Sequence, residues 1–308
     1  MSVYKLQPVL KDYIWGGYKL NPLFNRDNGG KKISESWEVS VHSDGESTSG
    51  EKTLSQIIKD TPCFIDKQEG DLPVLIKYID AAQNLSVQVH PDDAYAQKYE
   101  GDNGKTEMWY IISADEGAGI YCGFKKDIDK NTCLEKIKDG TIEEYLNFIP
   151  VKAGDCFLIE AGTVHAIGAG CLICEIQQSS NVTYRVYDYN RLGVDGKPRQ
   201  LHVDKALDVI KFEKFDNKTG TSGYFKVNNG KIRILTTCEY FTCKELILDG
   251  KYKSENINSF TAFNVIEGEG EINRIPFVAG DSFIAPCGEE VKIKGKAKII
   301  ITTKSEEL

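Results

Sequence analysis

Two short stretches of this chain repeat one pattern, and this repeat constrains the fold more than any other feature. Residues 151–159 read Val-Lys-Ala-Gly-Asp-Cys-Phe-Leu-Ile, and residues 277–285 read Phe-Val-Ala-Gly-Asp-Ser-Phe-Ile-Ala. The offset from Gly154 to Gly280 is 126 residues. Because self-similarity at a fixed offset indicates a repeated structural unit, we expect the chain to contain two related units.

Short apolar or alternating runs bounded by Gly, Pro, Asp or Asn dominate the chain, and such runs are typical of β-strands. They occur at residues 72–79, 85–90, 108–113, 156–159 and 172–177, and in the last third at 232–237, 241–248, 260–266, 282–285 and 297–302. Many short strands at close spacing favour a sandwich or a barrel. We therefore predict an all-β fold with minor helices.

Helices are expected at three places, each marked by a capping residue. Thr53 begins a capping-box pattern, and Asp92 is suited to cap a helix that ends before Gly101. A small helical pair is predicted over residues 127–148, with a second capping box at 141–144. This insertion explains why the first unit is longer than the second. The last glycine of an upstream Gly-x-Gly motif precedes the Gly-Asp turn by 35 residues in the first unit (Gly119 to Gly154) and by 10 in the second (Gly270 to Gly280).

A polar, turn-rich stretch at residues 216–223 predicts the boundary between the units. We expect a catalytic domain over residues 1–215, which carries the helical insertion, and a smaller β domain over residues 216–308. The second-unit position equivalent to His165 is Val291, and the second unit contains no histidine. The second unit is therefore predicted to lack a metal site.

The composition of the chain narrows its possible partners. A net charge of −8 argues against general nucleic-acid binding, which needs a basic face. No apolar run approaches the roughly 20 residues that span a bilayer. The first residues also lack the apolar core of a signal peptide. We expect neither a nucleic acid nor a membrane as a partner.

Cysteine usage predicts a cytoplasmic location, because nine cysteines, an odd number, fit reduced thiols better than a disulfide framework. Cys171 and Cys174 have the spacing of a C-x-x-C metal site. The residues around them indicate a strand, however, and residues three apart in a strand point to opposite faces. We therefore do not expect a zinc ribbon.

Four separate segments carry side chains suited to one metal site. Gln88 and His90 are two residues apart, so a strand would place both on one face. Glu107 begins another apolar run, and His165 follows the Gly-Asp repeat of the first unit. Two imidazoles, a carboxylate and an amide oxygen fit Zn2+ best, with Mn, Co or Fe as competitors. We predict one ion per chain, with a coordination position open to water or substrate.

Cationic residues accompany these candidate ligands. Lys105 lies two positions before Glu107, and Arg185 lies in a tyrosine-rich segment. Together with the metal site they predict a phosphorylated small-molecule substrate. Arg185 can instead be a structural ion-pair partner of Asp188. Lys77 can assist with phosphate, or it can extend its ammonium group out of an apolar strand to solvent.

The motifs resemble those of a known family. The Gly-Asp pattern that leads to His165 resembles the second motif of the cupins, which are jelly-roll β-barrels. The set as a whole resembles the type I mannose-6-phosphate isomerases in their short bacterial form, and the likeness extends over the whole chain. It implies two cupin-like jelly-roll β-barrel units. The motifs that carry it are Trp15-Gly16-Gly17, Glu35-Ser36-Trp37-Glu38, Gln88-Val89-His90-Pro91-Asp92-Asp93, Lys105-Thr106-Glu107-Met108-Trp109 and Tyr184-Arg185-Val186-Tyr187-Asp188-Tyr189.

This resemblance implies a metal-dependent aldose–ketose isomerase that interconverts mannose 6-phosphate and fructose 6-phosphate through an enediol. The residues that it assigns are the metal ligands His90, Glu107, His165 and Gln88, and the catalytic residues Arg185 and Lys105. We further expect substrate contacts from Lys77, Glu38 and Trp15. Arg185 can hold the phosphate or stabilise charge at the reacting oxygens, because its planar fork suits both roles.

Three questions stay open at this point. The general base can be Lys105, a water on the ion, or Glu38. The function can also be that of a metal-dependent cupin oxygenase, which has no use for an anion clamp, or of a non-catalytic cupin that binds sugar phosphate. The oligomeric state is expected to be monomer or homodimer.

Overall fold

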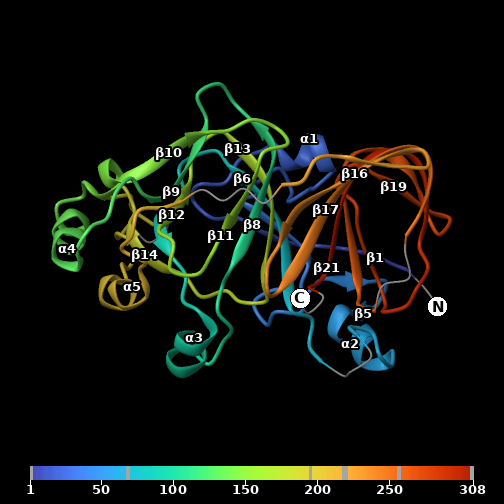
Figure 1. Cartoon of the computed structure of the whole chain (residues 1–308), viewed down its shortest axis with the longest axis horizontal. Coiled ribbons are helices and arrows are strands. Elements are labelled where there is room, and N and C mark those ends of the chain that lie inside the picture. Colours follow the sequence, from blue (N-terminus) through green and yellow to red (C-terminus); the bar gives the residue numbers. More distant parts are fainter. Residues whose placement is uncertain (1–2, 67–69, 194–195, 217–220, 255–257, 306–308) are drawn as a thin grey trace.

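The computed structural model describes residues 3–66, 70–193, 196–216, 221–254 and 258–305. Strands dominate it, and they form two groups that lie side by side along the long axis of the molecule (Figure 1). One group contains the strands between residues 74 and 187, together with strands at residues 9–11 and 35–39. The other contains the strands after residue 224, together with one strand at residues 4–6. The predicted fold class, mostly β with few helices, is confirmed.

Two antiparallel sheets build the first group. The six-stranded sheet has the order β11 (Cys156–Ile159), β8 (Glu107–Ala114), β13 (Cys171–Gln178), β6 (Val74–Ala81), β3 (Glu35–Val39) and β2 (Val9–Lys11). The five-stranded sheet has the order β10 (Leu146–Pro150), β9 (Gly119–Phe124), β12 (His165–Ile167), β7 (Val87–Val89) and β14 (Tyr184–Tyr187). One apolar core contains residues of both sheets, so the two sheets face each other.

Side-chain alternation along β13 explains why that strand is buried along its whole length. Cys171 and Ile173 belong to the core between the two facing sheets. Leu172 and Cys174 belong to a second core, which the six-stranded sheet shares with the C-terminal sheet. Cys171 and Cys174 are thus buried thiols on opposite faces, as the strand periodicity predicted.

An eight-stranded antiparallel sheet forms most of the second group. Its order is β1 (Tyr4–Leu6), β20 (Ser282–Ala285), β18 (Thr261–Ile272), β21 (Lys292–Lys304), β17 (Phe241–Lys253), β16 (Gly230–Thr237) and β15 (Phe225–Val227), with β19 (Ile275–Val278) paired to β18. A strand from the start of the chain therefore completes the edge of this sheet. The division at residue 216 stays a prediction, and residues 217–220 of the expected boundary lie outside the described residues.

The repeat has a structural cause, because both copies form the same turn. Gly154 and Gly280 have φ values of +88° and +92°, in the left-handed region that favours glycine. The carboxylate of Asp155 accepts a hydrogen bond from the backbone N–H of Lys152 at 2.9 Å. Asp281 accepts the equivalent bond from Val278 at 2.8 Å. Each turn leads directly into a strand, β11 in the first copy and β20 in the second.

Short helices complete the fold: α1 (Leu20–Phe24), α2 (Leu54–Asp60), α3 (Asp93–Tyr99), α4 (Lys130–Lys138), the 3-10 helix η1 (Ile142–Tyr145) and α5 (Val203–Val209). A further small sheet pairs β4 (Thr48–Ser49) with β5 (Lys52–Thr53). The capping box at Thr53 and the cap at Asp92 are both confirmed. Helices α4 and α5 pack on the outer face of the five-stranded sheet (Figure 1).

The helical pair predicted over residues 127–148 is partly wrong. It consists of α4 and the 3-10 helix η1, and residues 146–148 already belong to strand β10. The predicted capping box at Thr141 does not form, because this side chain makes no capping hydrogen bond. Its hydroxyl instead donates to the carboxylate of Asp139, the residue after α4. The Thr141 side chain is therefore bonded to the end of α4 and makes no bond to the first turn of η1.

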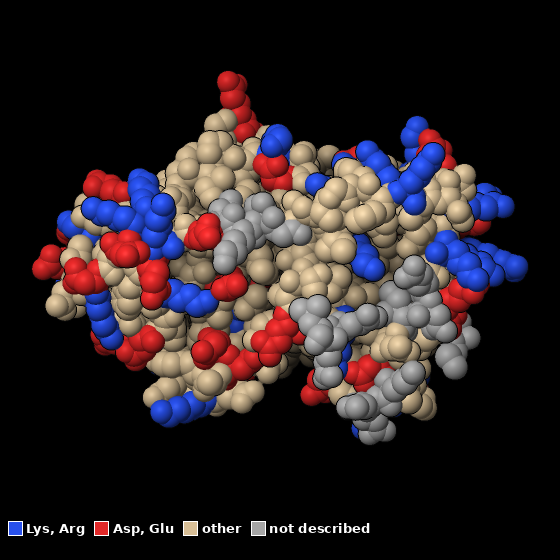
Figure 2. Space-filling view, viewed as in Figure 1, with Lys and Arg blue, Asp and Glu red and all other residues tan. Residues whose placement is uncertain are grey.

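Charged residues of both signs are interspersed over the face drawn in Figure 2. In the part of the chain that the structure describes, none of the helices has the length and apolar character needed to cross a membrane.

Candidate metal centre and active-site pocket

Three of the predicted ligands converge between the two facing sheets. His90 directly follows β7, Glu107 begins β8, and His165 begins β12. The Nε2 atom of His90 lies 3.4 Å from Oε2 of Glu107, and Nε2 of His165 lies 3.3 Å from Oε1. One ligand atom from each residue lies within 4.8 Å of the others. These distances suit three groups arranged around one shared ion.

Backbone carbonyls fix both imidazoles in the tautomer that a metal needs. Nδ1 of His90 lies 2.8 Å from the carbonyl oxygen of Val182, and Nδ1 of His165 lies 2.8 Å from that of Thr163. A carbonyl oxygen only accepts, so each Nδ1 carries the proton. Each Nε2 therefore turns a lone pair toward Glu107. Metal-binding histidines are commonly oriented by this kind of contact.

Burial makes the cluster unfavourable without a cation. His90, Glu107 and His165 are all buried, and Oε1 of Glu107 has no hydrogen-bond partner within the described part of the chain. Burial lowers the pKa of His165 to about 4 and holds the pKa of His90 well below its usual range. Burial also raises the pKa of the Glu107 carboxyl. Neutral imidazoles beside an incompletely bonded carboxylate are the donor set that binds a divalent transition metal.

Lys105 and Gln88 lie against this cluster. The Lys105 ammonium donates to the Glu107 carboxylate and lies 3.1 Å from Nε2 of His90. Gln88 is the register partner of His165, and its Nε2 lies 3.4 Å from Nε2 of that histidine. The segment containing residues 88 and 90 thus reaches the same cluster from the five-stranded sheet.

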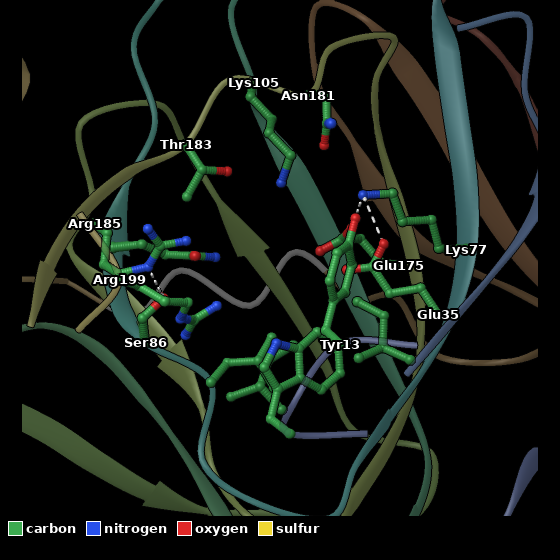
Figure 3. Close-up of a pocket in the computed structure, with 15 residues that line it drawn as sticks. Tyr13, Glu35, Lys77, Ser86, Lys105, Glu175, Asn181, Thr183, Arg185 and Arg199 are labelled. Atoms are coloured by element: carbon green, nitrogen blue, oxygen red, sulfur yellow. Dashed lines mark hydrogen bonds and ion pairs between the residues drawn. The ribbon is translucent and has the colours of Figure 1, made fainter. Parts of the chain in front are cut away.

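A cavity of about 290 Å³ opens beside the cluster, and Lys105 lines it (Figure 3). Gln88 also lines this cavity. This volume is near the lower end of the roughly 300–1,000 Å³ that is typical of small-molecule sites. One wall carries an ionic network. The Lys77 ammonium lies 3.6 Å from the Glu35 carboxylate and 3.5 Å from that of Glu175 (Figure 3).

Strand register places this network on the cavity side of the six-stranded sheet. Glu175 on β13 is opposite Lys77 on β6, which is in turn opposite Trp37 on β3. The indole N–H of Trp37 donates to Glu35 at 2.6 Å, and that of Trp109 donates to Glu175 at 3.0 Å. Although burial opposes the charge on Lys77, the two carboxylates raise its pKa, so the ammonium remains charged.

Arginines form the opposite wall of the cavity (Figure 3). Arg185 donates from Nε to the hydroxyl of Ser86 at 3.2 Å and from a terminal nitrogen to the backbone carbonyl of Gln200 at 2.9 Å. Arg199 donates to both carboxylate oxygens of Asp188, at 2.7 and 2.6 Å. Burial, with Arg199 nearby, lowers the pKa of Arg185 from its ordinary high value. The wall therefore concentrates positive charge at the cavity.

The structure does not bring every predicted residue to this cavity. Lys77 and Trp15 line it, but Glu38 does not. The Glu38 carboxylate lies on the other face of β3, where it accepts hydrogen bonds from Arg26 at 2.8 Å and from Ser282 at 2.7 Å. Asp188 forms ion pairs with Arg199 and Arg191, so the alternative of a structural ion pair between Arg185 and Asp188 is not supported.

Sequence reasoning missed several polar cavity residues, among them Glu175, Asn181 and Arg199. Glu175 had a usable signal, since it lies an even number of residues from Cys171 and Ile173 and so shares their face. Asn181 lies in the irregular segment between β13 and β14, and Arg199 in the one between β14 and α5, where no periodicity shows which way a side chain points.

Comparisons with known proteins agree with this geometry. The family model "Phosphomannose isomerase type I, catalytic domain" matches residues 3–127, and the model "Mannose-6-phosphate isomerase, cupin domain" matches residues 231–304. The mannose-6-phosphate isomerase of Streptococcus mutans is 36% identical over 91% of this chain and 91% of its own length. The mannose-6-phosphate isomerase ManA of Bacillus subtilis is 36% identical over 96% of this chain and 97% of its own length.

Solved structures extend the likeness to three dimensions. The mannose 6-phosphate isomerase from Bacillus subtilis superposes with a TM-score of 0.92 at 35% identity, covering 98% of this chain and 99% of that one. A protein from Archaeoglobus fulgidus shares the fold, with a TM-score of 0.80 at 21% identity. The predicted cupin-family fold is thereby confirmed, and the chain belongs to the type I mannose-6-phosphate isomerase family.

Proposed function

We propose that this chain interconverts mannose 6-phosphate and fructose 6-phosphate in the cavity of Figure 3, using a divalent ion held by His90, Glu107 and His165. One observation carries the assignment to these residues. The buried His-Glu-His cluster adjoins a cavity with cationic walls, and Lys105 belongs to both. This arrangement places a metal centre beside a binding site for an anionic sugar.

We infer that Gln88 completes the ligand set. Rotating its amide by half a turn places the oxygen where the nitrogen now lies, 3.4 Å from His165 Nε2. Such a rotation exchanges two groups of nearly equal size. Zinc suits the resulting mixed nitrogen and oxygen donors best, with manganese, cobalt and iron as competitors that metal analysis of the purified protein would distinguish.

Isomerisation moves one proton between C2 and C1 of the sugar, so the site needs a base at carbon and a source of positive charge at oxygen. A divalent ion stabilises negative charge on the sugar oxygens by several kcal/mol. We assign the second positive charge to the Lys105 ammonium, which lies at the ligand cluster and in the cavity wall. Its proton can be shared with the reacting oxygens.

The Glu175 carboxylate is our candidate for the base. It is buried in the cavity wall, and Lys105, Lys77 and the indole of Trp109 lower its pKa despite its burial. The carboxylate is therefore ionised and able to accept a proton. Nζ of Lys77 lies 3.5 Å from Oε2 of Glu175 and helps to fix its position. Glu38, which we had considered for this role, faces away from the cavity.

We propose that Arg185 and Arg199 bind the phosphate. The Arg185 side chain is held by Ser86 and Gln200 through Nε and one terminal nitrogen, and it lines the cavity. A preorganised planar guanidinium is well suited to a phosphate group. Family membership makes the open alternatives, a cupin oxygenase and a non-catalytic sugar-phosphate-binding cupin, less favourable. An oxygenase has no use for the arginines that bind an anion, and a non-catalytic protein has no use for a base such as Glu175.

A cytoplasmic location remains our expectation, and it is supported by six buried thiols at Cys122, Cys133, Cys156, Cys171, Cys174 and Cys243. We keep monomer and homodimer as the expected oligomeric states, and size-exclusion chromatography with light scattering separates them.

A coupled assay for fructose 6-phosphate formed from mannose 6-phosphate tests the function. We expect turnover to be lost on chelation and restored by Zn2+. The variant His165→Ala should lose both the ion and turnover, while the matched control His42→Ala, which alters a histidine outside this site, should keep both. Turnover that persists after complete removal of metal would eliminate the ion's role. Oxygen uptake by the iron-loaded protein would favour the oxygenase instead.

A further inference from the structure

We propose that Gln177 is a positioning residue of the metal centre, which holds both the loop that orients His90 and the space beside Glu107. This inference rests on the proposed function, because it assumes that an ion binds at the cluster. Gln177 lies near the end of β13 and is fully buried. It is the register partner of Glu107 on β8, so the two side chains share the interior face of the six-stranded sheet.

The amide N–H groups of Gln177 fix the loop after β13. Its Nε2 donates to the backbone carbonyl of Gln178 at 2.8 Å and to that of Ser180 at 2.6 Å. Two residues further along the same loop, the carbonyl of Val182 accepts from Nδ1 of His90 at 2.8 Å. The path from Gln177 to the metal ligand therefore consists of a short loop with a hydrogen bond at each end.

A second attachment, made by Ser180, also fixes the position of this loop. The hydroxyl of Ser180 donates to the carbonyl of Asn103 at 2.7 Å, just before the segment that carries Lys105. Asn181, the next residue, lines the substrate cavity. Loss of the Gln177 amide would release its two bonds to the loop, while other attachments remained, such as the bond from Ser180 to Asn103 and the bond from the Asn103 amide to the carbonyl of Ser179. We therefore expect a displaced Val182 carbonyl in an otherwise folded protein.

The amide oxygen of Gln177 adds an independent observation. Oε1 of Gln177 and Oε1 of Glu107 are both buried without a hydrogen-bond partner among the described residues. Directly opposed residues on antiparallel strands have Cβ atoms about 4.5–5.5 Å apart. Leaving one buried acceptor unsatisfied costs about 1–3 kcal/mol. Two such acceptors on neighbouring positions indicate that a cation, or a donor that it holds, belongs beside them.

Metal affinity is the property that this role should control. Outer contacts that orient metal ligands typically contribute about 10–100-fold in affinity. The variant Gln177→Met keeps the size and burial of the side chain but removes both donors and the acceptor. We expect it to weaken Zn2+ binding by about 10–100-fold. The reason is that His90 loses its fixed orientation and the ion loses a nearby oxygen.

Competition between the protein and a fluorescent chelator for Zn2+ measures this affinity directly. Asn264→Leu is the matched control. Asn264 is another fully buried amide whose oxygen has no partner in the residues that the structure describes, but it lies on β18 in the C-terminal sheet. Both variants lose a buried amide, and both should lower the thermal midpoint of the metal-free protein. Only Gln177→Met should raise the dissociation constant for Zn2+.

Each outcome has one meaning. A dissociation constant for Gln177→Met within twofold of the wild-type value overturns the proposal. An equal weakening in Asn264→Leu also overturns it, because the effect would then reflect general destabilisation. If Gln177→Met does not fold, Gln177→Leu serves in its place, since it also removes both amide donors and adds no charge beside the ion. Wild-type protein that binds no Zn2+ would refute the proposed function itself, which separates the two failures.

Discussion

The buried ion pair between Arg26 and Glu38 offers the sharpest test of how the two groups of strands are joined. Glu38 lies on β3 with 0% exposure, and its carboxylate accepts from Arg26 at 2.8 Å. It also accepts from the hydroxyls of Ser36 at 2.6 Å and Ser282 at 2.7 Å. Arg26 in turn donates to the carbonyl of Gly280 at 2.5 Å. The variant Arg26→Met removes the cation and keeps an unbranched side chain.

The expected loss follows from what Glu38 retains. Removing one partner of a buried ion pair costs about 3–5 kcal/mol, because the remaining charge is uncompensated. Two hydroxyl donors stay in place, so we expect a value near the lower end, about 3 kcal/mol at pH 8. The double variant Arg26→Met with Glu38→Gln removes the charge as well. It should recover most of this loss, although the carbonyl of Gly280 still lacks its donor.

The penalty should depend on pH in a defined direction. Burial raises the pKa of Glu38 above 4.5 even with Arg26 present, and loss of the cation raises it further. Between the unfolded and folded pKa values the folded state binds more protons, so stability falls as pH rises. The Arg26→Met variant should therefore regain stability from pH 8 toward pH 5. The slope should approach about 1.4 kcal/mol per pH unit within that window.

Urea unfolding of metal-free protein at pH 5, 6, 7 and 8 measures these differences. Chelation makes the metal ligands titrate alike in wild type and both variants, so their contribution cancels when the curves are subtracted. We expect a pH-dependent difference for Arg26→Met and a nearly flat one for the double variant. A loss under 1 kcal/mol at pH 8, or an equal pH dependence in both variants, would refute the reasoning.

Four other substitutions test separate parts of the structure. Lys105→Met removes a cation from the ligand cluster, so Zn2+ affinity by chelator competition should rise while turnover falls by about 10²–10⁴-fold. Arg185→Lys keeps the charge but loses the planar fork, so the KM for sugar phosphate should rise at least about tenfold while metal content stays unchanged. Tyr110→Phe removes a 2.6 Å hydrogen bond to Glu245, and urea unfolding should show a loss of about 1 kcal/mol. Thr53→Ala removes the capping box of α2 and should also cost about 1 kcal/mol by urea unfolding.

The opposite results are equally clear. Weaker Zn2+ binding in Lys105→Met would mean that this residue supports the ion instead of competing with it. An unchanged KM in Arg185→Lys would place the phosphate elsewhere. Unchanged stability in Tyr110→Phe or Thr53→Ala would show that solvent replaces these hydrogen bonds at no cost.

Local patterns predicted much of the fold, because strand periodicity and turn chemistry act within a few residues. The Gly-Asp repeat marked two copies of one turn, in which glycine is needed for positive φ and aspartate for a local hydrogen bond. The caps at Thr53 and Asp92 were also correct, since a cap needs only its own helix. The cap at Thr141 did not form, and its hydroxyl donates to the carboxylate of Asp139 at the end of the preceding helix.

The acidic residues of β3 show that strand periodicity does not by itself predict which face of a strand points to the cavity. Glu35 and Glu38 lie three positions apart, so they point to opposite faces, and the sequence alone does not show which face is the cavity. The pairing of β3 with β6 shifts register between Trp37 and Val39. In the folded chain Glu35 contacts Lys77 in the cavity wall, while Glu38 is enclosed against the C-terminal sheet.

The sequence by itself determined which residues could bind a cation, because ligand chemistry and strand spacing belong to the individual segments around Gln88, His90, Glu107 and His165. Only the tertiary structure decided that these segments meet. Three strands from two facing sheets bring the His-Glu-His cluster together, and loops without periodicity add Asn181 and Arg199 to the cavity. The physical reason is the distance along the chain over which each effect acts. The local backbone fixes the alternation of side chains, whereas the packing of sheets from distant segments sets the neighbours of each side chain.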